Sequence, residues 1–152
     1  MVNDRIDSGD VRPRRTEQRA ETGGAGMDDG LGRAFPEALG RKDATRLKAL
    51  LHPDVNFKAM TPGRFWEADS SDEVVDEVLL GAWFERSDEI VEVVSIETDD
   101  LSTAERVGYR FRVANLTGRF LVEQQAYLEP RDGRIGWLRI MCAGFRPEPA
   151  PS

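Results

Sequence analysis

Along the first half of the chain, apolar residues recur every three to four positions, the spacing of one face of a helix. Asp43 stands where an N-cap would open the second such segment. Pro53 forces His52 out of the helical region and so ends that segment. Ser70 followed by Glu73 forms a capping box before the third. The pattern predicts helices over residues 28–40, 44–51 and 71–84.

The other periodic segments alternate between apolar and polar residues, as half-buried strands do. A hairpin is predicted over residues 55–67, because Thr61-Pro62-Gly63-Arg64 has proline and glycine where a tight turn favours them. Four longer strands are predicted over residues 89–100, 105–116, 119–130 and 134–145. Helices early and strands late indicate an α+β fold. We expect a curved antiparallel sheet, the hairpin plus four long strands, packed against three N-terminal helices.

The periodic segments occupy only the middle of the sequence. Residues 1–27 lack hydrophobic periodicity and are glycine-rich near their end, which predicts a disordered leader. Residues 147–152 form a proline-rich tail. The 152-residue chain is therefore expected to fold as one domain over residues 28–146.

Charge and composition exclude several classes of function. The net charge is −7, and residues 1–26 hold five arginines and five acids, so the acidic excess lies in the folded part. A nucleic-acid-binding body is not expected, because phosphate contacts need a basic face. No apolar run reaches the roughly 18 residues of a membrane span, and no secretory signal is visible. We therefore expect a cytoplasmic protein.

Cysteine and histidine are too scarce for two other kinds of site. One cysteine, Cys142, excludes an internal disulfide framework. A single cysteine and a single histidine argue against a zinc site of these two ligands. The sequence therefore predicts no metal and no cofactor.

Three stretches together resemble the NTF2-like superfamily, and within it the SnoaL-like group related to polyketide cyclases and ketosteroid isomerases. They are ALGRKDATRLKALLHPDVNFKAM, FWEADSSDEVVDEVL and RDGRIGWLRIMCAGFRP. The resemblance covers residues 28–146 and implies a cone-shaped, cystatin-like fold with a pocket between helices and sheet. That fold hosts isomerases, cyclases, epoxide hydrolases, dehydratases, transport factors and ligand binders, so it does not decide the activity.

The resemblance also implies where catalytic groups of the isomerase branch would lie. That branch uses a tyrosine on the first helix, a carboxylate base before a proline, and a protonated aspartic acid on the penultimate strand. The matching positions here are Phe35, Thr61 and Gln125. Phe35 has no hydroxyl, Thr61 is a very poor base at neutral pH, and Gln125 can donate a hydrogen bond but not a proton. We therefore do not expect proton abstraction of the steroid-isomerase type.

Three other residues remain as catalytic candidates: Glu123, Asp69 and Tyr127. If Glu123 faces the pocket, together with Gln125 and Tyr127, it is a candidate base with polar neighbours. If the alternate residues face inward, Glu123 is solvated or lies at a dimer interface. Those alternate residues are Phe120, Val122, Gln124, Ala126 and Leu128, and they are the more apolar set. The sequence leaves both orientations open.

The favoured hypothesis is a protein of undetermined activity that binds a small apolar ligand in the pocket between helices and sheet. We expect the pocket to be lined by Phe35, Phe57, Thr61, Trp66, Trp83, Gln125, Leu138 and Cys142. The first alternative is an isomerase, cyclase or hydrolase acting on a polyketide-, terpenoid- or steroid-like substrate. The second is a non-enzymatic dimerisation module. Trp137, Arg139 and Met141 share the other sheet face and predict a homodimer through it.

Overall fold

The computed structural model describes residues 25–149. The chain divides into two units, one ending at Gly30 and one beginning at Leu31. The predicted leader lies outside the described residues except for 25–27, which open the first helix, and the end of the predicted tail, 150–152, also lies outside them.

The three predicted helices are present, and the second follows its sequence signals closely. The Asp43 side chain accepts a hydrogen bond of 3.0 Å from the backbone N–H of Arg46 and so caps this helix. The chain then passes directly into a strand at Leu51. None of the described helices is both long and apolar enough to cross a membrane. The helices are α1 (Ala25–Gly40), α2 (Ala44–Leu50) and η1 (Glu73–Trp83).

The third helix, η1, is a π-helix, which the sequence did not predict. Its first turn is capped as expected, since Ser70 Oγ accepts a hydrogen bond from the backbone N–H of Glu73. Further along, the helix widens, and the Phe84 N–H bonds back five residues to the Leu79 carbonyl at 2.9 Å. A Cβ at Gly81 would collide with the backbone carbonyl of Asp76, so a glycine is needed there.

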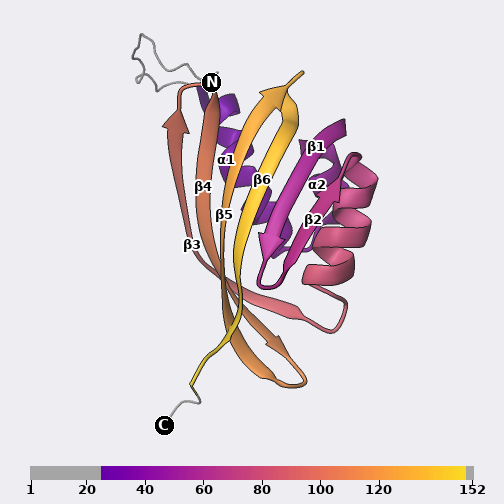
Figure 1. Cartoon of the computed structure of the whole chain (residues 1–152). Coiled ribbons are helices and arrows are strands. Elements are labelled where there is room, and N and C mark those ends of the chain that lie inside the picture. The colour runs from indigo at the N-terminus through magenta and orange to yellow at the C-terminus, as the bar shows by residue number, and fades with distance from the viewer. Residues whose placement is uncertain (1–24, 150–152) are drawn as a thin grey trace. The chain divides into compact units, whose positions relative to one another are not determined.

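All six predicted strands are present and form one sheet in the order β2-β1-β6-β5-β4-β3 (Figure 1). The expectation of an antiparallel sheet is wrong at one pair, because β1 and β6 run parallel and the sheet is mixed. Their direction depends on how the intervening chain crosses between them, which alternation within a strand does not encode. The strands are β1 (Leu51–Thr61), β2 (Arg64–Ala68), β3 (Glu89–Leu101), β4 (Ala104–Asn115), β5 (Gly118–Arg131) and β6 (Arg134–Pro147).

The edge strand β3 reaches the core through two β-bulges. Its register with β4 shifts between Ile90 and Glu92 and again between Val93 and Ser95. As a result Ile90, Val93 and Ile96, three residues apart, pair with core residues of β4 instead of alternating regularly. Bulges at an edge also hinder pairing with further strands.

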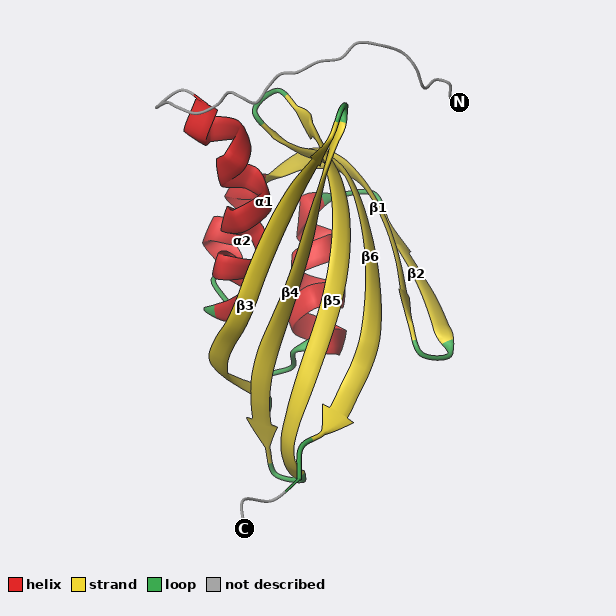
Figure 2. Ribbon diagram, turned by 90° about the vertical axis from the view of Figure 1, so that its left-hand side faces the viewer, coloured by secondary structure: helices red, strands yellow, loops and turns green. Residues whose placement is uncertain are grey.

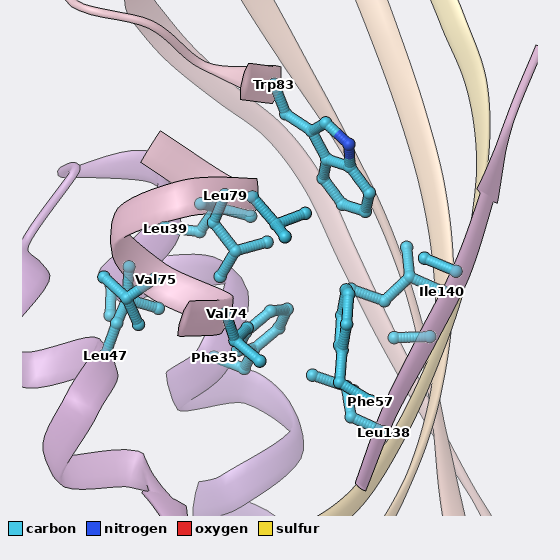
Figure 3. Packing of buried hydrophobic residues seen from close by; sticks show 14 of the residues in the cluster. Phe35, Leu39, Leu47, Phe57, Val74, Val75, Leu79, Trp83, Leu138 and Ile140 are labelled. Atoms are coloured by element: carbon cyan, nitrogen blue, oxygen red, sulfur yellow. The ribbon is translucent and has the colours of Figure 1, made fainter. Parts of the chain in front are cut away.

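The helices lie on one side of the curved sheet, which is open rather than closed into a barrel (Figure 2). The core lies between the two layers, as Figure 3 shows for the part around η1. Large side chains from the helices meet inward-facing positions of the sheet. The largest fully buried ones include Phe35, Leu39, Leu47, Phe57, Leu79, Tyr109, Phe111 and Leu138.

Candidate functional site

The orientation of β5 decides which side chains face the helices. Gln124 is only 1% exposed and lies in a buried set with Val122, Ala126 and Leu128. Glu123 points the other way, and 55% of its side chain is exposed. Its carboxylate accepts a hydrogen bond of 2.9 Å from Arg110 Nε on β4. The sequence left two orientations of this strand open, and the structure has the one in which the more apolar set of side chains faces inward.

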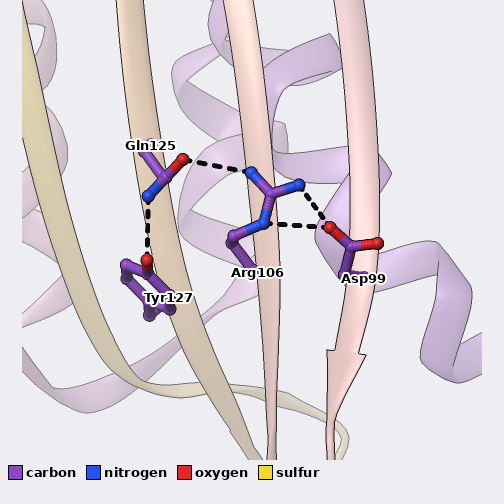
Figure 4. Close-up of polar contacts among 4 residues, drawn as sticks. All are labelled: Asp99, Arg106, Gln125 and Tyr127. Atoms are coloured by element: carbon purple, nitrogen blue, oxygen red, sulfur yellow. Dashed lines mark hydrogen bonds and ion pairs between the residues drawn. The ribbon is translucent and has the colours of Figure 1, made fainter.

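Gln125 and Tyr127 share the outer face of the sheet with Glu123. Gln125 Nε2 donates to the Tyr127 hydroxyl at 2.8 Å, and Arg106 Nη1 donates to Gln125 Oε1 at 3.1 Å (Figure 4). Arg106 also pairs with Asp99 on β3. Asp69 is exposed after β2, where its backbone N–H donates to the Glu73 side chain. The catalytic candidates Glu123, Asp69 and Tyr127 therefore lie away from the inner face.

Most of the residues that were expected to line a pocket are packed in the core and do not surround a wide opening. Five of them are buried: Phe35, Phe57, Trp83, Leu138 and Cys142. Thr61 and Trp66 are half-buried at the β1–β2 hairpin, where Trp66 Nε1 donates to Thr61 Oγ1 at 2.9 Å. The Trp66 ring meets that of Trp83 edge-on, with centroids 6.0 Å apart. Trp66 and Trp83 lie beside the inner face of the sheet and are called the aromatic wall below.

A row of polar side chains crosses this inner face. Tyr109 on β4 pairs with Gln124 on β5, which pairs in turn with Cys142 on β6. The Tyr109 hydroxyl donates a hydrogen bond of 2.7 Å to Gln124 Oε1. Burial, and after it the neighbouring Cys142, raise the pKa of Tyr109 well above its ordinary value, so the hydroxyl stays neutral. Below, Tyr109, Gln124 and Cys142 are called the inner row.

Two buried donors of the core have no hydrogen-bond partner in the described structure. They are Gln124 Nε2, in the inner row, and Trp83 Nε1, in the aromatic wall. A buried donor left without a partner costs about 1–3 kcal/mol. Native cores rarely contain buried donors without a partner unless there is a reason for them. A bound molecule with acceptor atoms is one such reason.

The inner row lacks a proton acceptor of the kind that acid–base catalysis needs. Within residues 30–149 the buried side chains that carry a carboxylate or an amide are Asp88 and Gln124. Asp88 is engaged elsewhere, accepting from the Glu85 backbone N–H and from Asn115 Nδ2. No group of three His, Cys, Asp or Glu side chains among the described residues could hold a metal ion. The site can therefore donate hydrogen bonds, but its own residues do not supply a base.

A hollow lies at the edge of the sheet, between α1 and β3. It is an open groove of about 490 Å³. Arg33 lines it and reaches the Ile96 carbonyl at 3.4 Å and Glu37 at 3.8 Å. Residues 90–96, the bulged part of β3, form its other wall. This groove was not predicted from the sequence, and neither were the two bulges in its β3 wall.

Tyr109 and Gln124 were not singled out from the sequence, although a signal was present. Gln124 is the one polar residue in the otherwise apolar side of the 119–130 strand. Tyr109 likewise carries a hydroxyl within the apolar side of the preceding strand. A polar residue in a buried set is more informative than an apolar one on the surface.

No protein-family model matches the sequence, and no curated protein matches it. Solved structures do match. A proposed isomerase of Bacillus subtilis has a TM-score of 0.65 and 12% identity, over 80% of this chain and 89% of that one. A proposed polyketide cyclase of a Silicibacter species has a TM-score of 0.61 and 16% identity, over 77% and 88%. An epoxide hydrolase of M. tuberculosis described as LEH-like has a TM-score of 0.56 and 18% identity, over 77% and 83%.

The chain has the fold of these structures, the NTF2-like fold. At identities below 20%, these likenesses establish the fold and leave the activity open. In this NTF2-like chain the inward positions of the central strands carry Tyr109 and Gln124 rather than carboxylates.

Proposed function

We propose that the protein binds a small, uncharged and largely apolar molecule against the inner face of its sheet. The observation that carries the proposal is the pair of buried donors, Gln124 Nε2 and Trp83 Nε1, which lack partners in the described structure. A carbonyl or ether oxygen of the ligand would accept from these donors, while its apolar body would pack against aromatic side chains.

The proposed ligand is neutral because the inner row offers no charge. A buried ion without a counter-charge is strongly disfavoured, and Tyr109 stays protonated. An anion or a cation entering there would find donors or an amide oxygen but no opposite charge. A neutral molecule with one or two acceptor atoms meets the chemistry of the row without that penalty.

Gln124 and Gln125 provide a matched pair of variants to test the proposal. The wild type, Gln124→Leu and Gln125→Leu would be screened by thermal shift against neutral apolar ketones, lactones and aromatic metabolites. A ligand at 100 times its Kd stabilises the folded state by about 2.7 kcal/mol. We expect a shift in wild type and in Gln125→Leu, and its loss in Gln124→Leu.

Two results would contradict this assignment. If no neutral compound shifted the wild-type melting temperature while charged compounds did, the ligand class would be wrong. If Gln125→Leu lost the response as completely as Gln124→Leu, the inner row would not be the site.

An isomerase, cyclase or hydrolase activity is the second candidate. It is supported by the proposed activities of the proteins with similar structures and by Tyr109, a neutral donor that could polarise a carbonyl group. It is opposed by the lack of a carboxylate in the inner row. Proton exchange of a bound ketone in D₂O, followed by NMR, separates the two: rapid exchange that Tyr109→Phe abolishes would favour the enzyme.

A cytoplasmic location stays a prediction from the sequence.

A further inference from the structure

Cys142 lies at the end of the inner row that is nearest to the surface. The exposed fraction is 1% for Tyr109 and for Gln124, and it rises to 8% for Cys142. On β6, Cys142 directly follows Met141, which pairs with Met60 near the end of β1, where the β1–β2 hairpin turns. In the order of the sheet, Cys142 therefore stands between this hairpin and the buried amide of Gln124.

The backbone of β6 is bulged directly after Cys142. One extra residue of β6 lies between the pair that joins Cys142 to Gln124 and the next pair along the two strands. Gly144, within this bulge, has a φ of +90°, which a glycine adopts at little cost. Its N–H donates a hydrogen bond of 3.4 Å to Cys142 Sγ. β-Bulges often re-aim groups next to active sites, and here the bulge puts a donor on the sulfur.

Gln124 faces Cys142 directly across the β5–β6 pair. Residues in such positions have Cβ atoms about 4.5–5.5 Å apart. The Tyr109 hydroxyl, on the opposite neighbour β4, holds Gln124 Oε1 at 2.7 Å. The two ends of an amide diverge, so this bond directs the unpartnered Nε2 away from β4. An amide donor without a partner and a thiol thus lie on neighbouring strands of the inner face.

These two groups match the two reacting ends of a conjugated carbonyl compound. Its oxygen can accept from Gln124 Nε2, while its β-carbon is attacked by soft nucleophiles, of which the thiolate is one. The Gly144 N–H on the sulfur stabilises that thiolate. A charged electrophile would find no opposite charge in the inner row. An internal disulfide is excluded, since the chain has a single cysteine.

We propose that the ligands of the inner row include neutral α,β-unsaturated ketones and lactones, and that Cys142 captures them covalently. This inference rests on the proposed function, because the Gln124 amide must first hold the carbonyl group. The thiol proton leaves to water, and the sulfur forms a bond to the β-carbon. The C=C π-bond breaks, and its electrons give an enolate whose oxygen stays on Gln124 Nε2. The α-carbon then takes a proton from water, so the whole thiol has added across the double bond without an oxidant or a reductant.

Cyclohex-2-en-1-one and cyclohexanone are matched probes, because they differ only in the C=C bond. Intact-mass spectrometry would follow adduct formation on the wild type, Cys142→Ser, Gln124→Leu and Gln125→Leu. We expect a single cyclohexenone on each wild-type chain and no adduct on Cys142→Ser. The wild-type rate should exceed that of free glutathione by about tenfold or more, because the amide holds the electrophile beside the sulfur. Gln124→Leu should lose this advantage, and Gln125→Leu should keep it.

Competition on the wild type keeps the test decisive if Gln124→Leu fails to fold. Cyclohexanone cannot form an adduct, so in excess it should slow the reaction by occupying the same site. Covalent capture is overturned by a wild-type rate no higher than that of glutathione, by an equal rate in folded Gln124→Leu, or by a rate that cyclohexanone does not change.

The thermal shift given by cyclohexanone separates the two failures. If cyclohexanone raises the wild-type melting temperature while cyclohexenone forms no adduct, covalent capture is wrong and the proposed function stands. If cyclohexanone gives no shift and cyclohexenone gives no adduct, both are wrong.

Discussion

The hydroxyl of Tyr109 donates a 2.7 Å hydrogen bond to Oε1 of Gln124, its cross-strand neighbour in the core. This bond joins the two central strands on the face that the helices cover. It fixes the amide so that Nε2, the other end of Gln124, remains without a partner in the described structure. The Tyr109–Gln124 hydrogen bond thereby holds the Gln124 Nε2 donor in place.

Tyr109→Phe should therefore destabilise the protein. The substitution keeps the ring but leaves Gln124 Oε1 buried without its donor, a loss of about 1–3 kcal/mol. Tyr127→Phe is the control, because the Tyr127 hydroxyl accepts a bond from Gln125 Nε2 on the half-buried outer face, where water can replace it. Urea unfolding would measure both. Equal losses would show that burial of the Tyr109 bond is unimportant.

Alkaline pH should weaken the fold through the same tyrosine. Burial raises the pKa of Tyr109, so the folded state holds its proton more tightly than the unfolded state. Its contribution is complete below the unfolded pKa of about 10 and is lost as pH rises above that value. The free energy of unfolding should fall from pH 9 to 11 less steeply in Tyr109→Phe than in wild type. Parallel curves would contradict the shift.

Gly81→Ala should destabilise the protein because the added Cβ would meet the Asp76 carbonyl. We expect a loss of about 1–3 kcal/mol, typical of a substitution that forces the backbone to shift. Gly30→Ala is the control, since a Cβ at this position in α1 meets nothing within 4 Å. There the better helix propensity of alanine should stabilise by up to about 1 kcal/mol. Thermal unfolding of both variants would measure the contrast.

A neutral or stabilising effect of Gly81→Ala would mean that η1 tolerates the change by returning to α-helical hydrogen bonding. Circular dichroism and the fluorescence of Trp83, at the end of η1, would then report the rearrangement.

Thr61→Val should affect the hairpin rather than the whole core. The change removes the acceptor of the Trp66 indole N–H, a half-buried bond of 2.9 Å. We expect a loss of about 1 kcal/mol and a red shift of tryptophan emission as Trp66 becomes more mobile. Thr117→Val, in the exposed β4–β5 turn, serves as the comparison and should leave the emission unchanged. An unchanged spectrum in Thr61→Val would show that this bond does not hold the ring.

Local pattern determined the elements of this protein. Asp43 caps α2 and Pro53 excludes its continuation, because both act on backbone groups within a few residues. The alternation in the 105–116 and 119–130 segments gave two strands, and it separated the apolar side of each from the polar one. Helix and strand periods arise from the backbone geometry of each segment, so they can be read without knowing what the segment packs against.

Tertiary structure decided the rest. The parallel β1–β6 pair joins residues about eighty positions apart, and no local pattern specifies its direction. The inward turn of Gln124 rather than Glu123 was settled by the helices that cover the apolar side of β5. The π-form of η1 and the bulges of β3 adjust each element to its neighbours. The site depends on these choices because it is assembled from three strands and a helix whose relative placement is a property of packing alone.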